Sequence, residues 1–293
     1  MIAAVAVLAP SGTRRTAALA PAASQLIYRT WHPMTLLHPD DRAVPQFVPE
    51  PERRQELVPR LLTGALFVVG AVAFAVAATV LSSTFDWPDI LREPAGVVLP
   101  AFVAGGTSLV WTRFATAWTY AILLVPILLL PAAVGRRDDA ALRAATFVGA
   151  ASVLLSLIGF LRWVFVVPPL ADSYVSGDAT TQAAVSAAWT AQHQFGGALL
   201  GEHLGQLLVL GWSVTVAVMI VRSRVLPTWV GWAGLVASGL YLLNQGDILA
   251  TAVTGFPVWD LAGLIGSTAW ALWVIALGVT LLRRQTAAGH RNR

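Results

Sequence analysis

Six long apolar stretches, separated by short polar connections, dominate the chain. They cover residues 61–81, 111–134, 140–167, 197–221, 228–243 and 261–282. A helix of about 20 apolar residues is long enough to cross the roughly 30 Å hydrocarbon core of a bilayer. Inside lipid every backbone N–H and C=O needs a partner within its own segment, so each stretch is predicted to be a helix. The pattern therefore predicts an all-α, polytopic membrane protein, a bundle of six transmembrane helices.

Composition agrees with a membrane protein. The chain is 57% hydrophobic and 12% charged, whereas a soluble domain is about 45–50% apolar and about 25% charged. Cysteine is absent, which excludes disulfides, thiolate nucleophiles and cysteine metal sites. All 19 basic residues are arginine and stand mostly beside the apolar stretches. We interpret them as orientation signals and contacts with anionic lipids. Membrane lipids are thus the expected partners, and neither nucleic acid, a cofactor nor a metal is expected.

The arginines fall on alternate connections. They precede the first stretch, separate the second from the third and the fourth from the fifth, and follow the sixth, whereas the other connections are acidic and hold only one arginine, Arg92. Connections rich in arginine stay in the cytoplasm. Both termini are therefore predicted to be cytoplasmic.

The segment 94–110 complicates this count, because it is apolar but short and contains Pro100 and the pair Gly105 and Gly106. We expect an interfacial or re-entrant segment at the outer surface. The alternative is a seventh span, which would move Arg136 and Arg137 outside.

The pattern divides the chain into three parts. Residues 1–58, rich in proline, alanine and charge, are expected to be a largely disordered tail. Met34 offers a second start, so an over-extended start is the alternative explanation of this tail. Residues 59–285 form the six-span domain, and residues 286–293 form a short basic tail.

Breakers and caps refine the helices. Pro126 and Pro131 lie inside the second span, where proline removes a backbone hydrogen bond and kinks the helix. The third span is expected to stop at Pro168. The segment 179–195, preceded by the capping residue Asp178, either lies on the outer surface or extends the fourth span outward.

Polar side chains inside the spans point to a pocket. A charged residue at a helix centre costs roughly 2.5–3.5 kcal/mol and usually faces the bundle interior or water. In the predicted topology these residues all lie in the outer third, while the inner halves are almost purely apolar. We therefore predict a polar pocket open to the extracytoplasmic side. Its candidate residues are Arg113, Arg162, Glu202, His203, Gln206, Asn244, Asp247 and Asp260.

Glu202 stands at the centre of this prediction. Its expected partner is Arg162 or, failing that, Arg113, in a bidentate pair that keeps both groups charged. The pair is either a pin between two helices or part of a ligand or proton site. Gly197, Gly201 and Gly205 form a stripe at spacing four, which favours close packing against a neighbouring helix.

Motifs of familiar chemistries are missing. Glu202 and His203 resemble the start of a metalloprotease motif, but no second histidine follows at the required spacing. A nucleophile elbow, a phosphate loop and a dinucleotide fingerprint are also absent. No residue can therefore be named as catalytic from the sequence.

The second half of the chain carries a family resemblance. The segments 161–168, 201–206, 224–234 and 270–278 resemble bacterial membrane proteins grouped as domain of unknown function 4386. The likeness covers roughly residues 61–284. It implies a multi-pass protein of the bacterial cytoplasmic membrane with no established activity, so it brings no functional residues.

Three functions remain open at this point. The first is a protein that binds a small or lipid-like ligand in the outward-facing pocket, as a sensor, accessory subunit or transporter. The second is a membrane enzyme acting on a lipid or isoprenoid, with Glu202 as acid or base assisted by His203 or Asp260. The third is a structural subunit that binds a partner protein through the glycine stripe.

Overall fold

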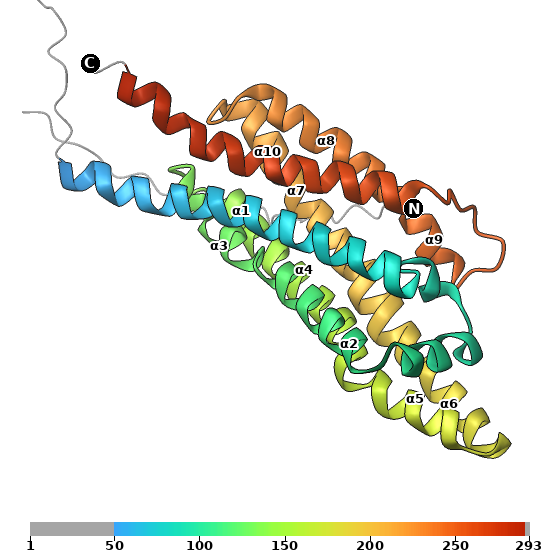
Figure 1. The fold of residues 1–293 in the computed structure, drawn as a ribbon. Helices are drawn as coiled ribbons and strands as arrows, with labels where there is room; N and C mark the ends of the chain where they lie inside the picture. The colour runs from blue at the N-terminus through green and yellow to red at the C-terminus, as the bar shows by residue number, and fades with distance from the viewer. Residues whose placement is uncertain (1–49, 291–293) are drawn as a thin grey trace, which may run out of the picture. The chain divides into compact units, whose positions relative to one another are not determined.

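The computed structural model describes the backbone of residues 50–290 and the side chains of residues 57–283. This part of the chain is helical and contains no strand (Figure 1). Its elements are α1 (Glu50–Phe85), η1 (Asp89–Arg92), α2 (Ala95–Ala121), α3 (Leu124–Ala133), α4 (Ala140–Phe165), α5 (Val167–Ser176), α6 (Ala179–Gln192), η2 (His193–Leu204), α7 (Gly205–Ser223), α8 (Thr228–Leu242), α9 (Gln245–Ala250) and α10 (Ala262–His290).

The tails proposed from the sequence lie mostly outside this range. Residues 1–49 and 291–293 are not among the described residues, so the predictions of a disordered tail and of an over-extended start stay predictions. Glu50 and the residues after it form the first turns of α1, and α10 continues to His290.

Five continuous helical segments of the described residues are long and apolar enough to cross a membrane. They are Leu57–Phe85, Ala95–Ala133, Ala140–Ser176, Ala179–Ser223 and Ala262–Arg283. The all-helical, multi-pass membrane character is therefore as predicted. The remaining predicted span, 228–243, corresponds to α8, whose 15 residues rise only about 22 Å. The backbone stays right-handed through Leu243 and Asn244, so α9 carries the same chain direction further.

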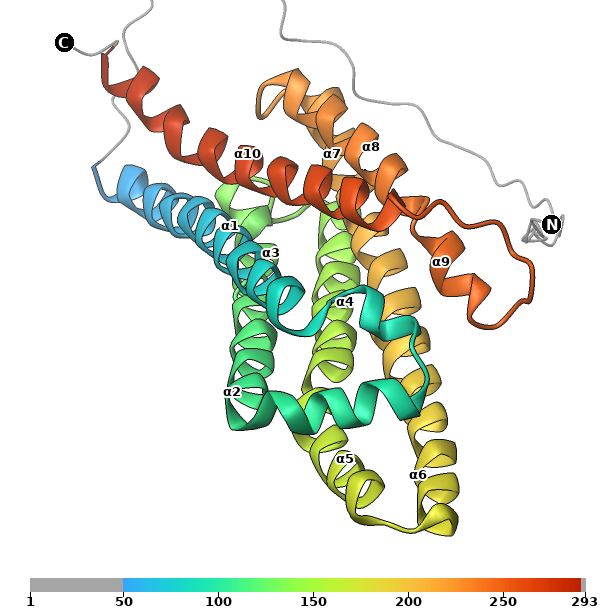
Figure 2. The same ribbon diagram turned by 45° about the vertical axis from the view of Figure 1, so that its right-hand side comes forward.

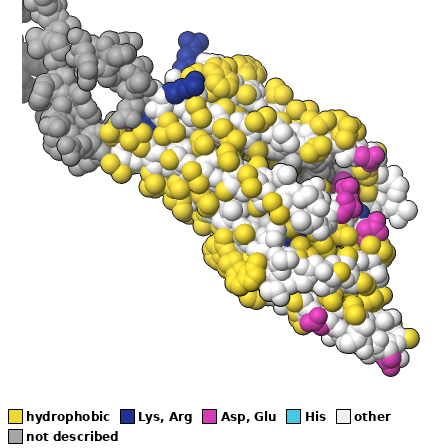
Figure 3. Space-filling view, viewed as in Figure 1, with side chains coloured by type: hydrophobic (Ala, Val, Ile, Leu, Met, Phe, Trp, Pro, Cys, Tyr) yellow, Lys and Arg dark blue, Asp and Glu magenta, His cyan; other side chains and the backbone are white. Residues whose placement is uncertain are grey.

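The first and last helices pack antiparallel over their length. A Cβ at Gly64 would lie 2.8 Å from the carbonyl oxygen of Gly278, so only glycine permits this approach. Arg60 Nε also donates to the Leu281 carbonyl at 3.0 Å. The start of α1 and the end of α10 therefore lie at the same end of the bundle. On the face drawn in Figure 3, arginine side chains gather toward that end and acidic side chains toward the other, with hydrophobic surface between.

Glycine and proline shape α2 and α3. Gly106 has φ 59° and ψ −159°, a conformation open essentially to glycine alone. The helix bends there, and its first part lies across the end of the bundle (Figure 2). The segment 94–110 is thus the first part of a bent helix that continues to Ala121, and its place relative to the membrane stays a prediction. The predicted proline break is also present. Pro126 has no N–H to donate to the carbonyl of Ile122, and α2 ends at Ala121, the residue before Ile122.

The segment 179–195 extends the fourth span outward, which was one of the two predicted arrangements. Residues Ala179–Ser223 form one apolar helical segment of 45 residues. Asp178 caps its start by accepting the Thr181 N–H at 2.9 Å. The middle third, η2, is a π-helix of 12 residues, a form with i→i+5 hydrogen bonds that is rare and frequent at functional sites.

Two apolar clusters fill the described bundle. The larger cluster includes Phe67, Trp212 and Trp273 and occupies the half nearer the start of α1 and the end of α10. The smaller cluster, around Phe102 and Trp163, lies where η1, α2, α5 and α6 meet. The candidate site lies beside this second cluster.

Candidate ligand-binding site

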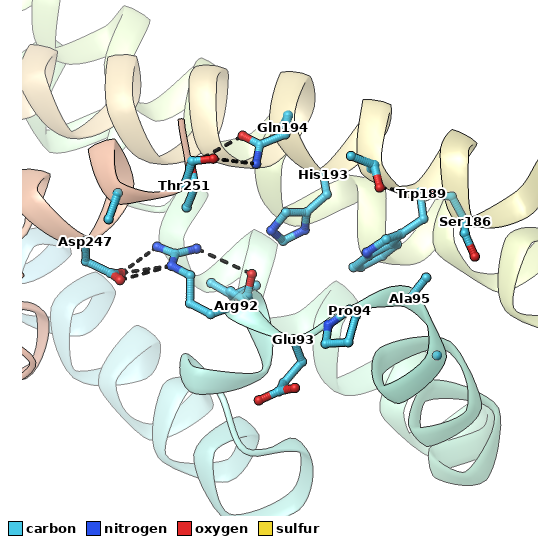
Figure 4. Close-up of a pocket in the computed structure, with 14 residues that line it drawn as sticks. Arg92, Glu93, Pro94, Ala95, Ser186, Trp189, His193, Gln194, Asp247 and Thr251 are labelled. Atoms are coloured by element: carbon cyan, nitrogen blue, oxygen red, sulfur yellow. Dashed lines mark hydrogen bonds and ion pairs between the residues drawn. The ribbon is translucent and has the colours of Figure 1, made fainter. Parts of the chain in front are cut away.

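A cavity of about 610 Å³ opens at the end of the bundle where η1, the start of α2, α6, η2 and α9 meet. We call this the acidic end, after its residues Asp86, Asp89, Glu93, Asp172 and Asp178. The cavity walls include Arg92, Trp189, His193, Gln194, Asp247 and Thr251 (Figure 4). Its volume falls in the range of roughly 300–1,000 Å³ usual for small-molecule sites.

Arg92 and Asp247 form part of the wall of this cavity, and Arg92 also holds Glu202, which does not line the cavity. Its Nη2 lies 2.8 Å from Glu202 Oε2 and 2.6 Å from Asp247 Oδ2, and its Nε lies 3.0 Å from the same Asp247 oxygen. Burial lowers the pKa of Arg92, but the two carboxylates outweigh this and raise the pKa above its usual value. The ion pairs of this cluster therefore link η1, η2 and α9, and its three side chains remain charged.

The predicted partner of Glu202 was wrong. The sequence pointed to Arg162 or Arg113, because both lie inside spans, and assigned Arg92 to an outer connection. In the structure Ile90 and Leu91 are buried in the second apolar cluster, so the turn η1 folds back onto the bundle. Arg92, which follows them directly, is carried inward to Glu202.

Arg162 has a different environment. Its Nη1 donates to the His193 carbonyl at 3.0 Å, and its Nη2 lies 3.4 Å from His193 Nδ1. A Cβ at Gly197 would overlap this guanidinium at 1.6 Å. Arg162 thus occupies the space that a side chain at Gly197 would fill. Arg162 and Glu202 line the same smaller cavity of about 90 Å³, without a direct bond between them among the described contacts.

Arg113 is held by aromatic rings. Its guanidinium carbon lies 4.2 Å from the centroid of the Trp163 ring and 4.8 Å from that of Phe85. The residue is 2% exposed, and its guanidinium nitrogens have no hydrogen-bond partner within the described part of the chain. Cation–π attraction, worth about 2 kcal/mol or more when desolvated, is therefore the interaction that stabilises this charge. Arg113 lines neither cavity.

The glycine stripe packs against α4, as its spacing predicts. A Cβ at Gly201 would lie 2.8 Å from the Cα of Gly159, and Ser152 donates its hydroxyl to the Gly205 carbonyl at 2.7 Å. The close-packing interpretation is therefore confirmed for these two glycines. Because α4 covers the stripe, this surface is used within the chain.

Amide side chains form a second polar group between η2, α7 and the α8–α9 junction. Gln206 Nε2 donates to the Tyr241 carbonyl at 2.7 Å, and its Oε1 accepts from Gln245. His203 Nδ1 lies 2.6 Å from Gln245 Oε1, and Asn244 Nδ2 lies 3.4 Å from Gln206 Oε1. Three predicted residues, His203, Gln206 and Asn244, thus converge around Gln245.

The predicted set is therefore brought together in part. Glu202 and Asp247 meet at Arg92, and the amide group lies next to them on the same helices. Asp260 is exposed in the turn before α10 and lines neither cavity. No hydrogen bond or ion pair between described residues joins Glu202 to His203 or Asp260, the trio that an enzyme was expected to use.

Sequence reasoning missed Arg92, Trp189, His193, Gln194, Gln245 and Thr251. The signal for three of them was present, because Trp189, His193 and Gln194 end the segment 179–195. Placing that segment as an outward extension of the fourth span would have set them above Glu202. Over the residues whose side chains are described, no cluster of three or more His, Cys, Asp or Glu could hold a metal ion.

Comparison with known proteins gives a family and no closer relative. The family model described as domain of unknown function (DUF4386) matches residues 62–278. No curated protein and no solved structure matches the chain. The matched range covers most of the 293 residues and agrees with the resemblance seen in the sequence. The chain is therefore a member of the DUF4386 family.

Proposed function

We propose that the protein binds a small ligand in the 610 Å³ cavity at its acidic end, as a sensor, an accessory subunit or a transporter. The observation that carries this proposal is the cavity itself, with Arg92 and Asp247 in its wall and Glu202 paired with Arg92. Glu202 belongs to a membrane-spanning segment, where a charged side chain is costly and usually marks a functional site. Its partner Arg92 and the neighbouring Asp247 form one wall of a space large enough for a ligand.

The proposed topology places this cavity on the extracytoplasmic side of a bacterial cytoplasmic membrane. Arginine-rich connections at the opposite end support a cytoplasmic location for both termini. The start of α1 and the end of α10 share one end of the bundle, which requires an even number of crossings. We therefore propose six, with α8 and α9 together as the short fifth.

The interior beneath the cavity favours binding over a continuous channel. Leu130, Trp212, Val216 and Ile220 are buried at 0% exposure in the larger apolar cluster. A transported molecule would have to displace this packing, whereas a bound ligand leaves it intact.

A cavity-blocking variant tests the proposal. Thr190 is an exposed residue of the cavity wall, so Thr190→Trp places an indole in the ligand space. The matched control is Thr180→Trp, because Thr180 is an exposed threonine in the first turn of the same helix and lies outside the cavity. Native mass spectrometry of the membrane-extracted protein should show a bound small molecule in the wild type and in Thr180→Trp, and its loss in Thr190→Trp.

Two results contradict the proposal. One is a wild-type protein that carries no added mass under conditions that preserve lipid adducts. The other is an added mass that persists in Thr190→Trp at the wild-type occupancy.

A further inference from the structure

The cavity wall carries a net negative charge, from Arg92, Glu93 and Asp247, and Figure 4 draws the Glu93 carboxylate pointing away from Trp189. Arg92, Glu202 and Asp247 form a single ion cluster with one positive and two negative groups. Asp247 is the most open of the three, with 36% of its side chain exposed, against 28% for Arg92 and 23% for Glu202. A cationic group entering the cavity would therefore meet an acceptor whose charge is only partly balanced.

The other side of the cavity carries hydrogen-bond donors. α2 begins at Ala95 behind Pro94, without a side-chain cap. The N–H groups of Val97 and Val98 both bond to the Pro94 carbonyl, whereas the first N–H groups of a helix, those of Ala95 and Gly96, have no intrahelical acceptor. Both residues line the cavity. A helix start of this kind attracts anions.

Trp189 supplies an independent donor at the same place. Its side chain lines the cavity, yet the residue is 4% exposed. It packs against His193 and Trp163 at centroid distances of 5.0 and 5.5 Å, and no hydrogen bond of its indole N–H is found among the described residues. Figure 4 places Trp189 between His193 and Ala95, with Asp247 on the far side of Arg92. This indole N–H is therefore available as a donor to a ligand in the cavity.

We infer that the ligand is a zwitterion, with an ammonium group and a phosphate or carboxylate group. The ammonium group lies at Asp247, and the anionic group accepts from Trp189 and from the start of α2. This inference rests on the proposed function and adds the chemical class of the ligand. The same chemistry occurs in free amino acids, in phosphoethanolamine and in the headgroup of phosphatidylethanolamine.

Titration calorimetry of the detergent-purified protein with phosphoethanolamine tests the class. Phosphoethanolamine is expected to bind at least about tenfold more tightly than inorganic phosphate or ethanolamine alone, since each half engages only one side of the cavity. Trp189→Phe keeps the aromatic ring but removes the donor, and Asp247→Asn removes the acceptor charge. Each change should weaken binding about tenfold, as expected for one hydrogen bond to a charged group.

Matched variants control for unrelated effects. Trp118→Phe alters a tryptophan that is 52% exposed on α2, and Asp260→Asn alters an exposed aspartate outside the cavity. Both should bind phosphoethanolamine like the wild type. Binding of phosphate or ethanolamine as tight as that of phosphoethanolamine, absence of any binding in this set, or unchanged affinity in Trp189→Phe would overturn the inference.

A second experiment, with lipids, distinguishes a free zwitterion from the headgroup of phosphatidylethanolamine. Protein in nanodiscs that contain equal amounts of phosphatidylethanolamine and phosphatidylglycerol is examined by native mass spectrometry. Retention of phosphatidylethanolamine that is lost in Trp189→Phe identifies the headgroup, whereas equal retention of both lipids together with phosphoethanolamine binding identifies a free zwitterion. If Thr190→Trp displaces a ligand that is not zwitterionic, this inference is wrong but the proposed function stands. If Thr190→Trp displaces no ligand, both are wrong.

Discussion

Arg92 is the cation that Glu202 and Asp247 share, so the three groups are not equivalent. Removing one carboxylate leaves a neutral pair of the arginine with one aspartate or glutamate. Removing the arginine leaves two carboxylates facing each other with no cation between them. Leaving a charge without its partner costs more than removing a surplus charge.

Thermal unfolding in detergent should show this asymmetry. Arg92→Gln is expected to lower the free energy of unfolding by about 2 kcal/mol, a value reduced because the cluster is partly open to water. Glu202→Gln is expected to cost less than about 1 kcal/mol. Equal losses in the two variants would show that the three groups do not act as one cluster.

The packing of η2 against α4 depends on the absence of a side chain at Gly201. At Gly201 a Cβ would lie 2.8 Å from the backbone of Gly159, and a backbone atom cannot turn aside as a side chain can. Gly201→Ala should therefore push η2 away from α4 and lower the free energy of unfolding by about 1–3 kcal/mol. The control is Gly239→Ala in α8, where the added Cβ meets nothing within 4 Å. That change should be neutral or raise stability by up to about 1 kcal/mol, and a Gly201→Ala protein as stable as wild type would contradict the packing argument.

The start of α6 should respond to acid. The Thr181 backbone N–H lowers the pKa of Asp178, followed by the Thr181 hydroxyl. A carboxyl whose pKa is depressed on folding stabilises the helix above its ordinary pKa of 3.8 and loses this effect as the pH falls through the depressed value. Hydrogen exchange, corrected for its intrinsic pH dependence, should show weaker protection of Thr181 at low pH in the wild type. Asp178→Asn keeps a capping side chain that does not titrate, so its protection should not change over the same range.

Periodicity and most breakers predicted the helices because each of those signals is local. The expected stop of the third span at Pro168 was wrong, because α5 contains this proline in its first turn and continues the helical segment to Ser176. The spans, the break before Pro126 and the cap at Asp178 depend on residues within a few positions of each other. The pairing of Glu202 depends on how a turn 110 residues earlier folds back onto the bundle, and neither hydropathy nor spacing contains that information. The π-helix was also missed, because the spacing of four among Gly197, Gly201 and Gly205 was interpreted with the 3.6 residues per turn of an α-helix.

The crossing count concerns the whole molecule, and the absence of cysteine makes it directly measurable. Ser176 is exposed at the end of α5, and Asp138 is exposed in the connection between α3 and α4. Ser176→Cys should react with a membrane-impermeant maleimide on intact spheroplasts, whereas Asp138→Cys should react only after the membrane is opened. The unmodified chain provides a background without thiols. Labelling of Asp138→Cys on intact spheroplasts would reject the proposed orientation.

The helix that runs from Ala179 to Ser223 also has a practical consequence for imaging. Its 45 residues rise roughly 60–70 Å, about twice the thickness of hydrocarbon that it has to cross. A rigid lever of this length, joined to α5 by the short turn at Gly177, would hold a grafted epitope or an antibody fragment well clear of a detergent micelle. Small membrane proteins are hard to align in electron micrographs, and the hairpin of α5 and α6 offers an attachment point for such a fiducial.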